Sequence, residues 1–333
     1  ACSNAAKMAR PGGGFTTDYT GSVMISQIQL LDVPAPFYAK GKILENKEKI
    51  AEICNARDPM LVKLGGGVKD VEVRVLDSLV GPMVVVHLLV DTGDAMGANA
   101  VNTMAEAVAP FLEELTGGRA ELRILSNLAD HRIARARAVF KKDAIGGEEV
   151  VDKMIAAYAF AAADPYRAAT NNKGIMNGII PVVIATGNDT RAIESGAHAY
   201  AARSGQYSPF ATWEKNADGD LVGSIEMPMA VGLVGGATKI HPAAKVAVKM
   251  LGVKTAGELA QIIAAVGLAQ NMAAMRALAT EGIQRGHMSL HARNLAATAG
   301  ATGELLEKIV KQMVSEKNVR LEYAQELVKQ YQK

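Results

Sequence analysis

Cysteine is scarce in this sequence of 333 residues, which contains only Cys2 and Cys54. Two cysteines cannot build a disulfide scaffold, and no CxxC pair or Cys/His cluster indicates a structural zinc site. We therefore expect a protein of the reducing cytoplasm that has no metal site and does not depend on disulfide bonds for its stability.

An excess of charge of either sign is also missing. The sequence has 36 Lys+Arg against 34 Asp+Glu, which gives a formal net charge of +2. This balance disfavours a nucleic-acid-binding surface or a polybasic membrane anchor, because both need concentrated positive charge. No uninterrupted apolar stretch reaches the roughly 20 residues of a membrane span. We expect a soluble protein that binds small molecules and neither nucleic acid nor membrane.

The beginning of the sequence lacks both a methionine and an apolar signal region. The first ten residues, ACSNAAKMAR, have the composition of a helix that is entered partway along, so we expect a further segment upstream of Ala1. With 49% hydrophobic residues, the chain can bury a substantial core that is divided between two or more structural units.

Residues 22–126 alternate between strand-like and helix-like runs. The predicted elements are, in order, a strand at 23–33, a helix at 40–57, strands at 71–76 and 83–90, a helix at 98–115 and a strand at 119–125. A turn containing Gly81 and Pro82 makes the two middle strands a hairpin. The resulting βαββαβ order is the ferredoxin-like, split-βαβ arrangement.

The rest of the chain is predicted to be rich in helices. The expected elements are a helix at 150–163, a short buried strand at 178–186, a strand pair at 221–234 interrupted by Pro228, and a core helix at 255–280. Two amphipathic helices follow, with apolar stripes that begin at Leu305 and Leu321, and both are expected to fold back on the body. The sequence thus predicts an α+β protein.

The first motif that can carry chemistry is DTGDAMGANAVNTMAE, residues 91–106, where a strand meets a long helix. Free amides at a helix N-terminus favour a phosphate, and Gly93 and Gly97 would let a ligand approach the backbone closely. Spacing alone favours the simpler interpretation, a capped helix start. No GxGxxG follows a predicted strand, which argues against an ordinary Rossmann site.

The second motif is DPYRAATNNKGIMNGI, residues 164–179, which surrounds Lys173 with polar side chains. Donors for an anionic or carbonyl-bearing substrate are available from Arg167, Asn171, Asn172 and Asn177. A polar turn explains the segment equally well, so the residues alone leave both interpretations open.

The third motif is ATGNDTRAIESGAHAY, in which Asp189 follows a predicted buried strand. A carboxylate at the carboxyl end of a strand is well placed for a functional site. Aspartate is also a favoured N-cap, and a helix is predicted to start near Arg191. N-capping is the simpler interpretation of Asp189 when it is considered alone.

The fourth motif is GHMSLHARNLA, residues 286–296. His287 and His291 are four residues apart and would share one helix face, as zinc ligands do in HExxH, but Met288 occupies the position of the glutamate. Metal-dependent hydrolysis is therefore disfavoured. A histidine here can instead protonate a leaving thiolate, and Arg293 can pair with phosphate. A surface helix with two ordinary histidines is the alternative.

Singly these motifs are weak, but their combination and order resemble one family. The segments DAMGANAVNTMAE, NKGIMNG, ATGNDTRAIE, GLVGGATKIHP and GHMSLHARNLA resemble successive motifs of class II (bacterial-type) 3-hydroxy-3-methylglutaryl-coenzyme A (HMG-CoA) reductases. The resemblance implies reduction of HMG-CoA to mevalonate and coenzyme A by two hydride transfers, or the reverse oxidation. It also implies active sites between the subunits of a homodimer or a higher even oligomer.

The resemblance further implies three domains. Residues 1–21 and 127–283 would form a large, helix-rich α/β substrate-binding domain. Residues 22–126 would form an inserted ferredoxin-like, non-Rossmann dinucleotide-binding domain, in agreement with the βαββαβ order predicted above. Residues 284–333 would form a small C-terminal helical flap that carries the catalytic histidine.

Carried onto this sequence, the resemblance implies three groups of site residues. The catalytic residues would be Lys173, Asp189 and His287. The nicotinamide dinucleotide would contact Asp58, Asp94, Met96, Gly97, Asn99 and Asn127. The hydroxymethylglutaryl end would contact Arg167 and Asn177, and coenzyme A would contact His291 and Arg293. Because a carboxylate at Asp58 would bind ribose hydroxyls and repel a 2′-phosphate, we expect NADH as the cofactor in preference to NADPH.

One departure from the family pattern bears on activity. The family's catalytic glutamate and a substrate-binding serine lie a few residues before the helix that begins here as ACSNAAKMA, and this sequence contains neither. Two hypotheses therefore stay open. The chain is an active reductase, or it is a catalytically inactive scaffold that still binds coenzyme A and the dinucleotide.

Overall fold

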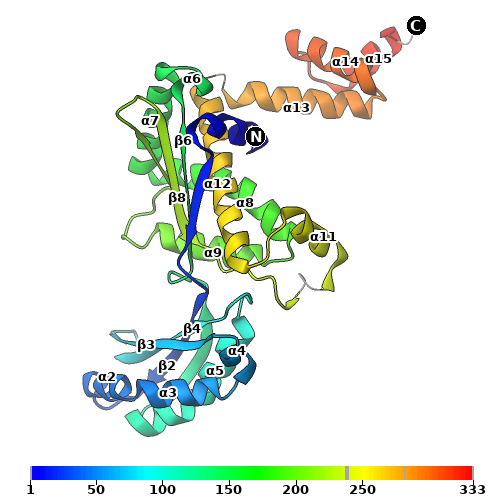
Figure 1. Ribbon diagram of the computed structural model, residues 1–333. Coiled ribbons are helices and arrows are strands. Elements are labelled where there is room, and N and C mark those ends of the chain that lie inside the picture. Colours follow the sequence, from blue (N-terminus) through cyan, green and yellow to red (C-terminus); the bar gives the residue numbers. More distant parts are fainter. Residues whose placement is uncertain (1, 237–239, 281, 332–333) are drawn as a thin grey trace.

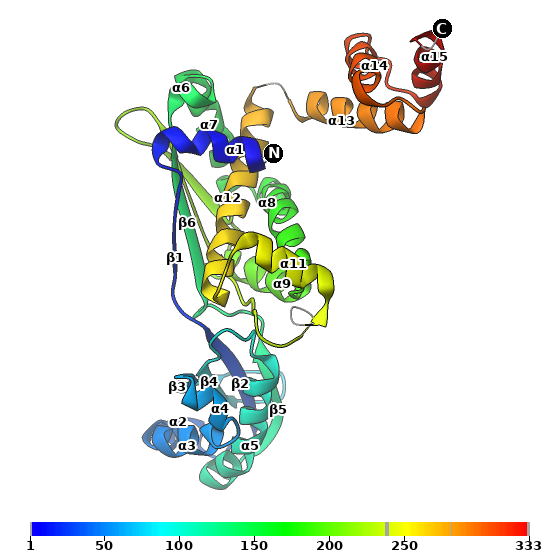
Figure 2. The same ribbon diagram turned by 45° about the vertical axis from the view of Figure 1, so that its right-hand side comes forward.

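The computed structural model describes residues 2–236, 240–280 and 282–331. Across these residues the chain forms two antiparallel four-stranded sheets, each packed against helices (Figure 1). A group of C-terminal helices extends away from both sheets in both views (Figures 1 and 2). The described chain is thus a mixed α/β structure, and neither sheet is the parallel sheet of an ordinary Rossmann domain.

The smaller sheet follows the βαββαβ order predicted from the sequence. Its elements are β2 (Val23–Leu31), α2 (Pro36–Glu45), α3 (Lys47–Asn55), α4 (Pro59–Lys63), β3 (Gly67–Leu76), β4 (Met83–Asp91), α5 (Ala98–Thr116) and β5 (Arg119–Ser126). The strand order is β3-β4-β2-β5, so β3 and β4 form the predicted hairpin. Apolar residues of β2, β4 and α5, such as Met24, Leu88 and Leu112, are fully buried in one cluster.

The single helix predicted at 40–57 is divided into α2 and α3. The side-chain amide of Asn46 donates to the Lys42 carbonyl at 2.8 Å where α2 ends. The Asp58 carboxylate begins α4 by accepting from the Leu61 amide at 2.9 Å. Asparagine and aspartate bond to the backbone in competition with helix continuation, and apolar periodicity does not register that competition.

The larger sheet combines one strand that precedes the smaller sheet with three that follow it. Its elements are α1 (Cys2–Ala9), the 3-10 helix η1 (Arg10–Gly12), β1 (Phe15–Tyr19), β6 (Ile133–Phe140), α6 (Lys142–Ile145), α7 (Glu148–Ala163), α8 (Pro165–Ala185), α9 (Thr190–Ala201), β7 (Ala211–Lys215), β8 (Leu221–Pro228), α11 (Pro242–Leu251) and α12 (Ala256–Ala279). The strand order is β1-β6-β8-β7. Helix α12 contacts three of these strands and also α8, so it lies at the centre of this core.

Helix α12 is long and apolar enough to cross a membrane by length and composition. Its residues Leu259, Ile263 and Met272 are fully buried inside the protein, and Asn271 accepts a hydrogen bond from the Trp213 indole at 2.7 Å. Burial on protein neighbours and a satisfied polar group are typical of a core helix.

The segment 178–186, predicted as a buried strand, is the last part of helix α8. Its β-branched residues favour a strand when they are considered alone. In the structure Ile175, Ile179 and Val183 follow each other at intervals of four residues and are fully buried in the core that contains α12. Packing on a neighbouring helix therefore decides the conformation. The predicted strand pair at 221–234 is also wrong beyond Pro228, because β8 ends there and pairs with β6 and β7 instead.

The C-terminal helices are α13 (Ile283–Thr298), α14 (Gly303–Ser315) and α15 (Leu321–Tyr331). The two predicted amphipathic helices are present, but they do not fold back on the body. Their apolar faces pack on each other and on α13, in a separate cluster that includes Ala292, Ile309, Met313 and Leu327. The stripes are thus buried within the group itself, which projects from the end of α12 (Figure 2).

Candidate functional site

A cavity of about 700 Å³ lies where the smaller sheet meets the larger one. The smaller sheet's side contributes Arg57, Asp58, residues 95–100 and Thr103, and the larger sheet's side contributes 187–189, Gly232 and 234–236. Five of the residues predicted from sequence line this cavity together, namely Asp58, Met96, Gly97, Asn99 and Asp189. The fold therefore joins one predicted catalytic residue to four of the predicted cofactor-binding residues.

The N-terminus of α5 opens into this cavity without a cap. Among residues 2–236, 240–280 and 282–331 no side chain accepts from its first amides, and the first intrahelical bond runs from the Val101 amide to the Gly97 carbonyl at 3.1 Å. Gly97 has φ 95°, and a Cβ there would lie 2.3 Å from Cγ2 of Thr92. The capped helix start favoured by spacing alone is therefore wrong, and the free amides suit a phosphate group.

The segment 231–234 ties the two walls of the cavity together. The Gly232 amide donates to Oδ1 of Asn188 at 2.8 Å, and the Leu233 amide donates to the Asp94 carbonyl at 2.8 Å. A Cβ at Gly232 would lie 2.5 Å from the Met96 amide nitrogen, so only glycine allows this approach. The cofactor-side turn and the loop before Asp189 are thus held at a fixed separation.

Arg132 is a buried side chain that contacts the backbone of both walls of the cavity. It is fully buried, and its guanidinium donates to the Tyr19 hydroxyl at 2.7 Å, the Thr92 hydroxyl at 3.2 Å and the carbonyls of Ala95 at 3.1 Å, Met96 at 3.3 Å and Val231 at 2.6 Å. Every one of these acceptors is neutral, and within the described residues no carboxylate pairs with this cation. Burying a charge without a partner is costly, so the guanidinium is balanced only by oriented dipoles.

The two aspartates of the cavity both act as helix N-caps, and a ligand would have to use their remaining acceptor positions. Oδ1 of Asp189 accepts from the Arg191 amide at 2.9 Å and the Ala192 amide at 3.3 Å. Partial burial raises the pKa of the Asp189 carboxyl, but these hydrogen bonds outweigh it and hold the pKa below its ordinary value. Asp189 is therefore ionised at neutral pH.

Lys173, Arg167 and Asn177 lie on α8 and do not line the cavity. Lys173 and Asn177 are exposed and four residues apart, so they share one face of the helix. Within the described residues no ion pair joins Lys173 to Asp189. In a single chain, therefore, the two predicted catalytic groups are not brought together.

The neighbouring asparagines lie on helix α8 rather than in a polar turn, and they are not the substrate donors that the sequence also allowed. Asn172 is fully buried, where it donates to the Ser208 carbonyl at 2.9 Å and accepts from the Phe210 amide at 2.9 Å. Asn171 is buried and accepts from the side chain of Asn271 on α12 at 2.9 Å. These bonds fix the rotation of α8, so both asparagines are unavailable as substrate donors and instead hold Lys173 outward.

Two predicted cofactor residues also lie outside the cavity lining. Oδ1 of Asp94 accepts from the Ala256 amide at 2.7 Å and so supports the start of α12, while the Asp94 backbone carbonyl holds the segment 231–234. Asn127 is exposed in the turn after β5. Asp94 thus contributes to the shape of the cavity through its backbone.

The fourth motif lies in α13, which projects away from the cavity (Figures 1 and 2). The side chain of His287 falls outside the described residues. His291 is exposed, and Arg293 is paired with Glu307 of α14 at 2.6 Å. In the described chain, no three His, Cys, Asp or Glu side chains lie close enough together to hold a metal ion.

Arg132 and Asn188 were missed as site residues in the sequence. Arg132 stands just before β6, in which Arg135 and Arg137 alternate with alanines as on a half-exposed strand. Its position is out of phase with those two arginines, but a single arginine at the end of a strand is most simply interpreted as a surface charge. Asn188 precedes Asp189 in a turn where an asparagine needs no further explanation. Only the contact between distant segments shows their part in the cavity.

Comparison with known proteins gives the same answer as the motifs. The family model described as hydroxymethylglutaryl-coenzyme A reductase matches residues 1–292. The 3-hydroxy-3-methylglutaryl-coenzyme A reductase of Archaeoglobus fulgidus is 63% identical over 328 residues, which covers 98% of this chain and 75% of that protein. A probable reductase of Borreliella burgdorferi is 39% identical over 246 residues, covering 72% of this chain and 56% of that protein.

Solved structures agree as well. The class II reductase from Streptococcus pneumoniae, bound to NADPH in open conformations, matches with a TM-score of 0.83 and 42% identity, covering 100% of this chain and 81% of that one. The resemblance inferred from the order of the motifs is therefore confirmed, as is the mixed α/β architecture with its two antiparallel sheets. This chain belongs to the hydroxymethylglutaryl-coenzyme A reductase family, and within it to class II.

Proposed function

We propose that this chain reduces HMG-CoA to mevalonate and coenzyme A in two steps, through mevaldehyde. The observation that carries the proposal is the cavity in which a free helix N-terminus, Asp58 and Asp189 meet. A nicotinamide dinucleotide bound there would supply the hydrides. The uncapped amides at 98–100 would bind its phosphates, Asn99 would line its site, and Gly97 and Gly232 would leave it room.

The catalytic roles follow from charge and position. Lys173 would stabilise the negative charge that develops on the substrate carbonyl oxygen. Asp189, which is ionised at neutral pH, would hold that lysine, and His287 would protonate the departing coenzyme A thiolate. Asp94, Met96 and Asn127 are proposed to complete the cofactor site. Arg167 and Asn177 would bind the hydroxymethylglutaryl end, and His291 and Arg293 would bind coenzyme A.

The arrangement is best explained by a homodimer, and we propose that it works in the cytoplasm. Lys173 and Asn177 are exposed on α8 and outside the cavity of their own chain, so a second subunit would complete the site around them. We further propose that 22–126 is a ferredoxin-like cofactor domain, that 1–21 with 127–283 is the substrate domain, and that 284–333 is a flap. Three separate hydrophobic clusters among the described residues support this division.

The proposal is tested by comparing two substrates in the His287→Gln variant. Loss of a general acid costs about 10²–10⁴-fold in rate, so HMG-CoA reduction should fall by that order. Mevaldehyde reduction expels no thiolate and should suffer far less, and NADH binding should persist. The comparison uses steady-state kinetics on both substrates, with dinucleotide affinity from a fluorescence titration. Equal losses on the thioester and the aldehyde would remove His287 from this role.

A second prediction concerns the choice between NADH and NADPH. Asp58 and Arg57 both line the cavity, and they would act on a 2′-phosphate in opposite directions. We propose that Asp58 dominates and that NADH is preferred. Asp58→Asn keeps an N-cap for α4 but removes the negative charge, so kcat/KM for NADPH relative to NADH should rise about tenfold, as for a change of about 1.4 kcal/mol. An unchanged ratio would exclude Asp58 from the ribose site.

A further inference from the structure

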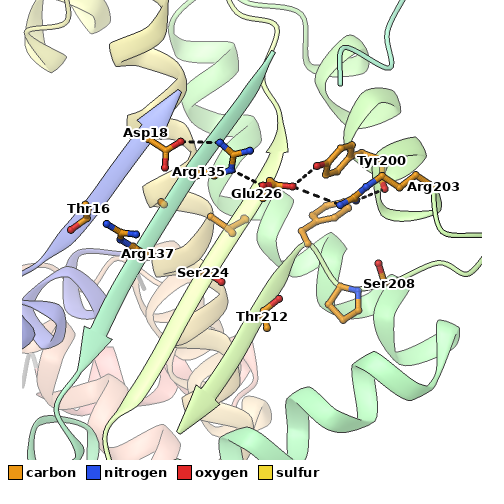
Figure 3. A pocket seen from close by; sticks show the side chains of 14 residues that line it. Thr16, Asp18, Arg135, Arg137, Tyr200, Arg203, Ser208, Thr212, Ser224 and Glu226 are labelled. Carbon is orange, nitrogen blue, oxygen red and sulfur yellow. Dashed lines mark hydrogen bonds and ion pairs between the residues drawn. The ribbon is translucent and has the colours of Figure 1, made fainter. Parts of the chain in front are cut away.

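A second cavity, of about 470 Å³, lies on the face of the larger sheet that carries Arg135 and Arg137 (Figure 3). Strands β1, β6, β8 and β7 form its floor, and the end of α9 with residues 208–210 forms one wall. It shares no lining residue with the candidate active site. The two cavities are therefore separate within the chain.

One row of side chains across this sheet is electrically satisfied. Asp18, Arg135 and Glu226 are direct cross-strand neighbours, and Arg135 pairs with Asp18 at 3.0 Å and with Glu226 at 2.5 Å. Glu226 also accepts from the Tyr200 hydroxyl and lies 3.7 Å from Arg203, whose guanidinium stacks on the Tyr200 ring. Two carboxylates thus balance two guanidiniums, as the dashed lines in Figure 3 follow.

The next row across the sheet has a cation without a counter-charge. Thr16, Arg137, Ser224 and Thr212 are cross-strand neighbours, one from each of the four strands. Within the described residues the side chain of Arg137 has no ion pair and no hydrogen bond. The cavity lining holds three arginines and two carboxylates, so the one excess positive charge belongs to Arg137.

The chemistry of this row suits an oxyanion. A guanidinium presents a planar fork of donors that matches phosphate oxygens, and each hydroxyl can add one donor. Neighbouring strands are about 4.8 Å apart, so Thr16 and Ser224 flank Arg137 closely enough to contact the same group. Thr212 lies one strand farther, where it could reach a second phosphate. Glu214 on β7 is the cross-strand neighbour of Val222 in the following row, and it does not line the cavity.

We propose that this cavity is an accessory phosphate site, in which the Arg137 guanidinium and the hydroxyls of Thr16 and Ser224 bind a phosphate or diphosphate group. The ligand could be inorganic or could be the phosphate end of a nucleotide, since both present the same oxygens. Arg135, Asp18 and Glu226 would form the neutral edge of the site rather than contact the ligand.

Isothermal titration of the whole chain with inorganic phosphate, pyrophosphate and ADP tests the proposal. Wild type should bind pyrophosphate, and Arg137→Gln should weaken that binding about tenfold or more, as for the loss of a charge-assisted hydrogen bond. Arg320→Gln, which removes an exposed arginine just before α15, should leave pyrophosphate binding unchanged. Tighter binding of ADP than of pyrophosphate would identify a nucleotide as the source.

Three results on these proteins would overturn the proposal. The first is wild-type protein that binds none of the three probes, and the second is unchanged binding in Arg137→Gln. The third is binding that NADH displaces completely, because the ligand would then occupy the candidate active site. If Arg137→Gln lowers the melting temperature, the Thr16→Val and Ser224→Ala double variant keeps the charge and removes the two hydroxyls. Unchanged affinity in that folded variant would equally reject the site.

Discussion

Replacing Lys173 with methionine is expected to lower kcat for HMG-CoA reduction by about 10²–10³-fold, the usual cost of removing one donor that stabilises an oxyanion. Methionine keeps the length of the side chain without its charge. Because Lys173 is exposed on α8, the free energy of unfolding should change by less than about 0.5 kcal/mol. Steady-state kinetics and urea unfolding of the same preparation measure both quantities.

The matched control for this variant is Lys153→Met. Lys153 is an exposed helical lysine on α7 that pairs with Glu149 at 2.6 Å, and it does not line the candidate active-site cavity. The Lys153→Met variant should keep wild-type kcat, and its free energy of unfolding should fall only by the small contribution of a surface ion pair. If Lys173→Met turned over as fast as this control, the proposed oxyanion role would be rejected.

Arg132→Met is expected to lower the free energy of unfolding by about 3 kcal/mol, because buried carbonyls that it serves would lose their donor. The Val231 and Met96 carbonyls belong to the two sides of the cavity. Affinity for the dinucleotide should therefore fall together with stability. Urea unfolding without ligand and a fluorescence titration with NADH give the two values.

Arg276→Met is the matched control for the buried arginine. Arg276 is half-buried near the C-terminal end of α12 and donates to the Ile145 carbonyl at 2.8 Å. The Arg276→Met substitution should lower the free energy of unfolding by about 1 kcal/mol and leave NADH affinity unchanged. An Arg132→Met protein as stable as wild type would mean that the cost of burying the charge cancels the free energy of its hydrogen bonds. The conclusion that Arg132 stabilises the walls of the cavity would then be rejected.

Much of the smaller sheet could be predicted from the sequence, because its information is local. Runs of β-branched and other apolar residues mark β2 and β4, the turn at Gly81 and Pro82 marks the hairpin, and the apolar period of α5 marks a helix. The order of the motifs was sufficient to indicate the family. Met96, Gly97, Asn99 and Asp189 belong to those motifs, Asp58 was matched to the family in a weaker one, and all five line one cavity.

Only the tertiary structure decided the remaining features. The segment 178–186 is helical because Ile179 and Val183 bury themselves beside α12, and no pattern within the segment contains that neighbour. Asn172 is a brace rather than a donor because Ser208 and Phe210, more than 30 residues away, take its hydrogen bonds. Arg132 looks like a surface charge at the start of β6, yet acceptors from residues 19, 92, 95, 96 and 231 enclose it. Local propensity is a property of neighbours along the chain, whereas burial and hydrogen-bond partners are properties of neighbours in space.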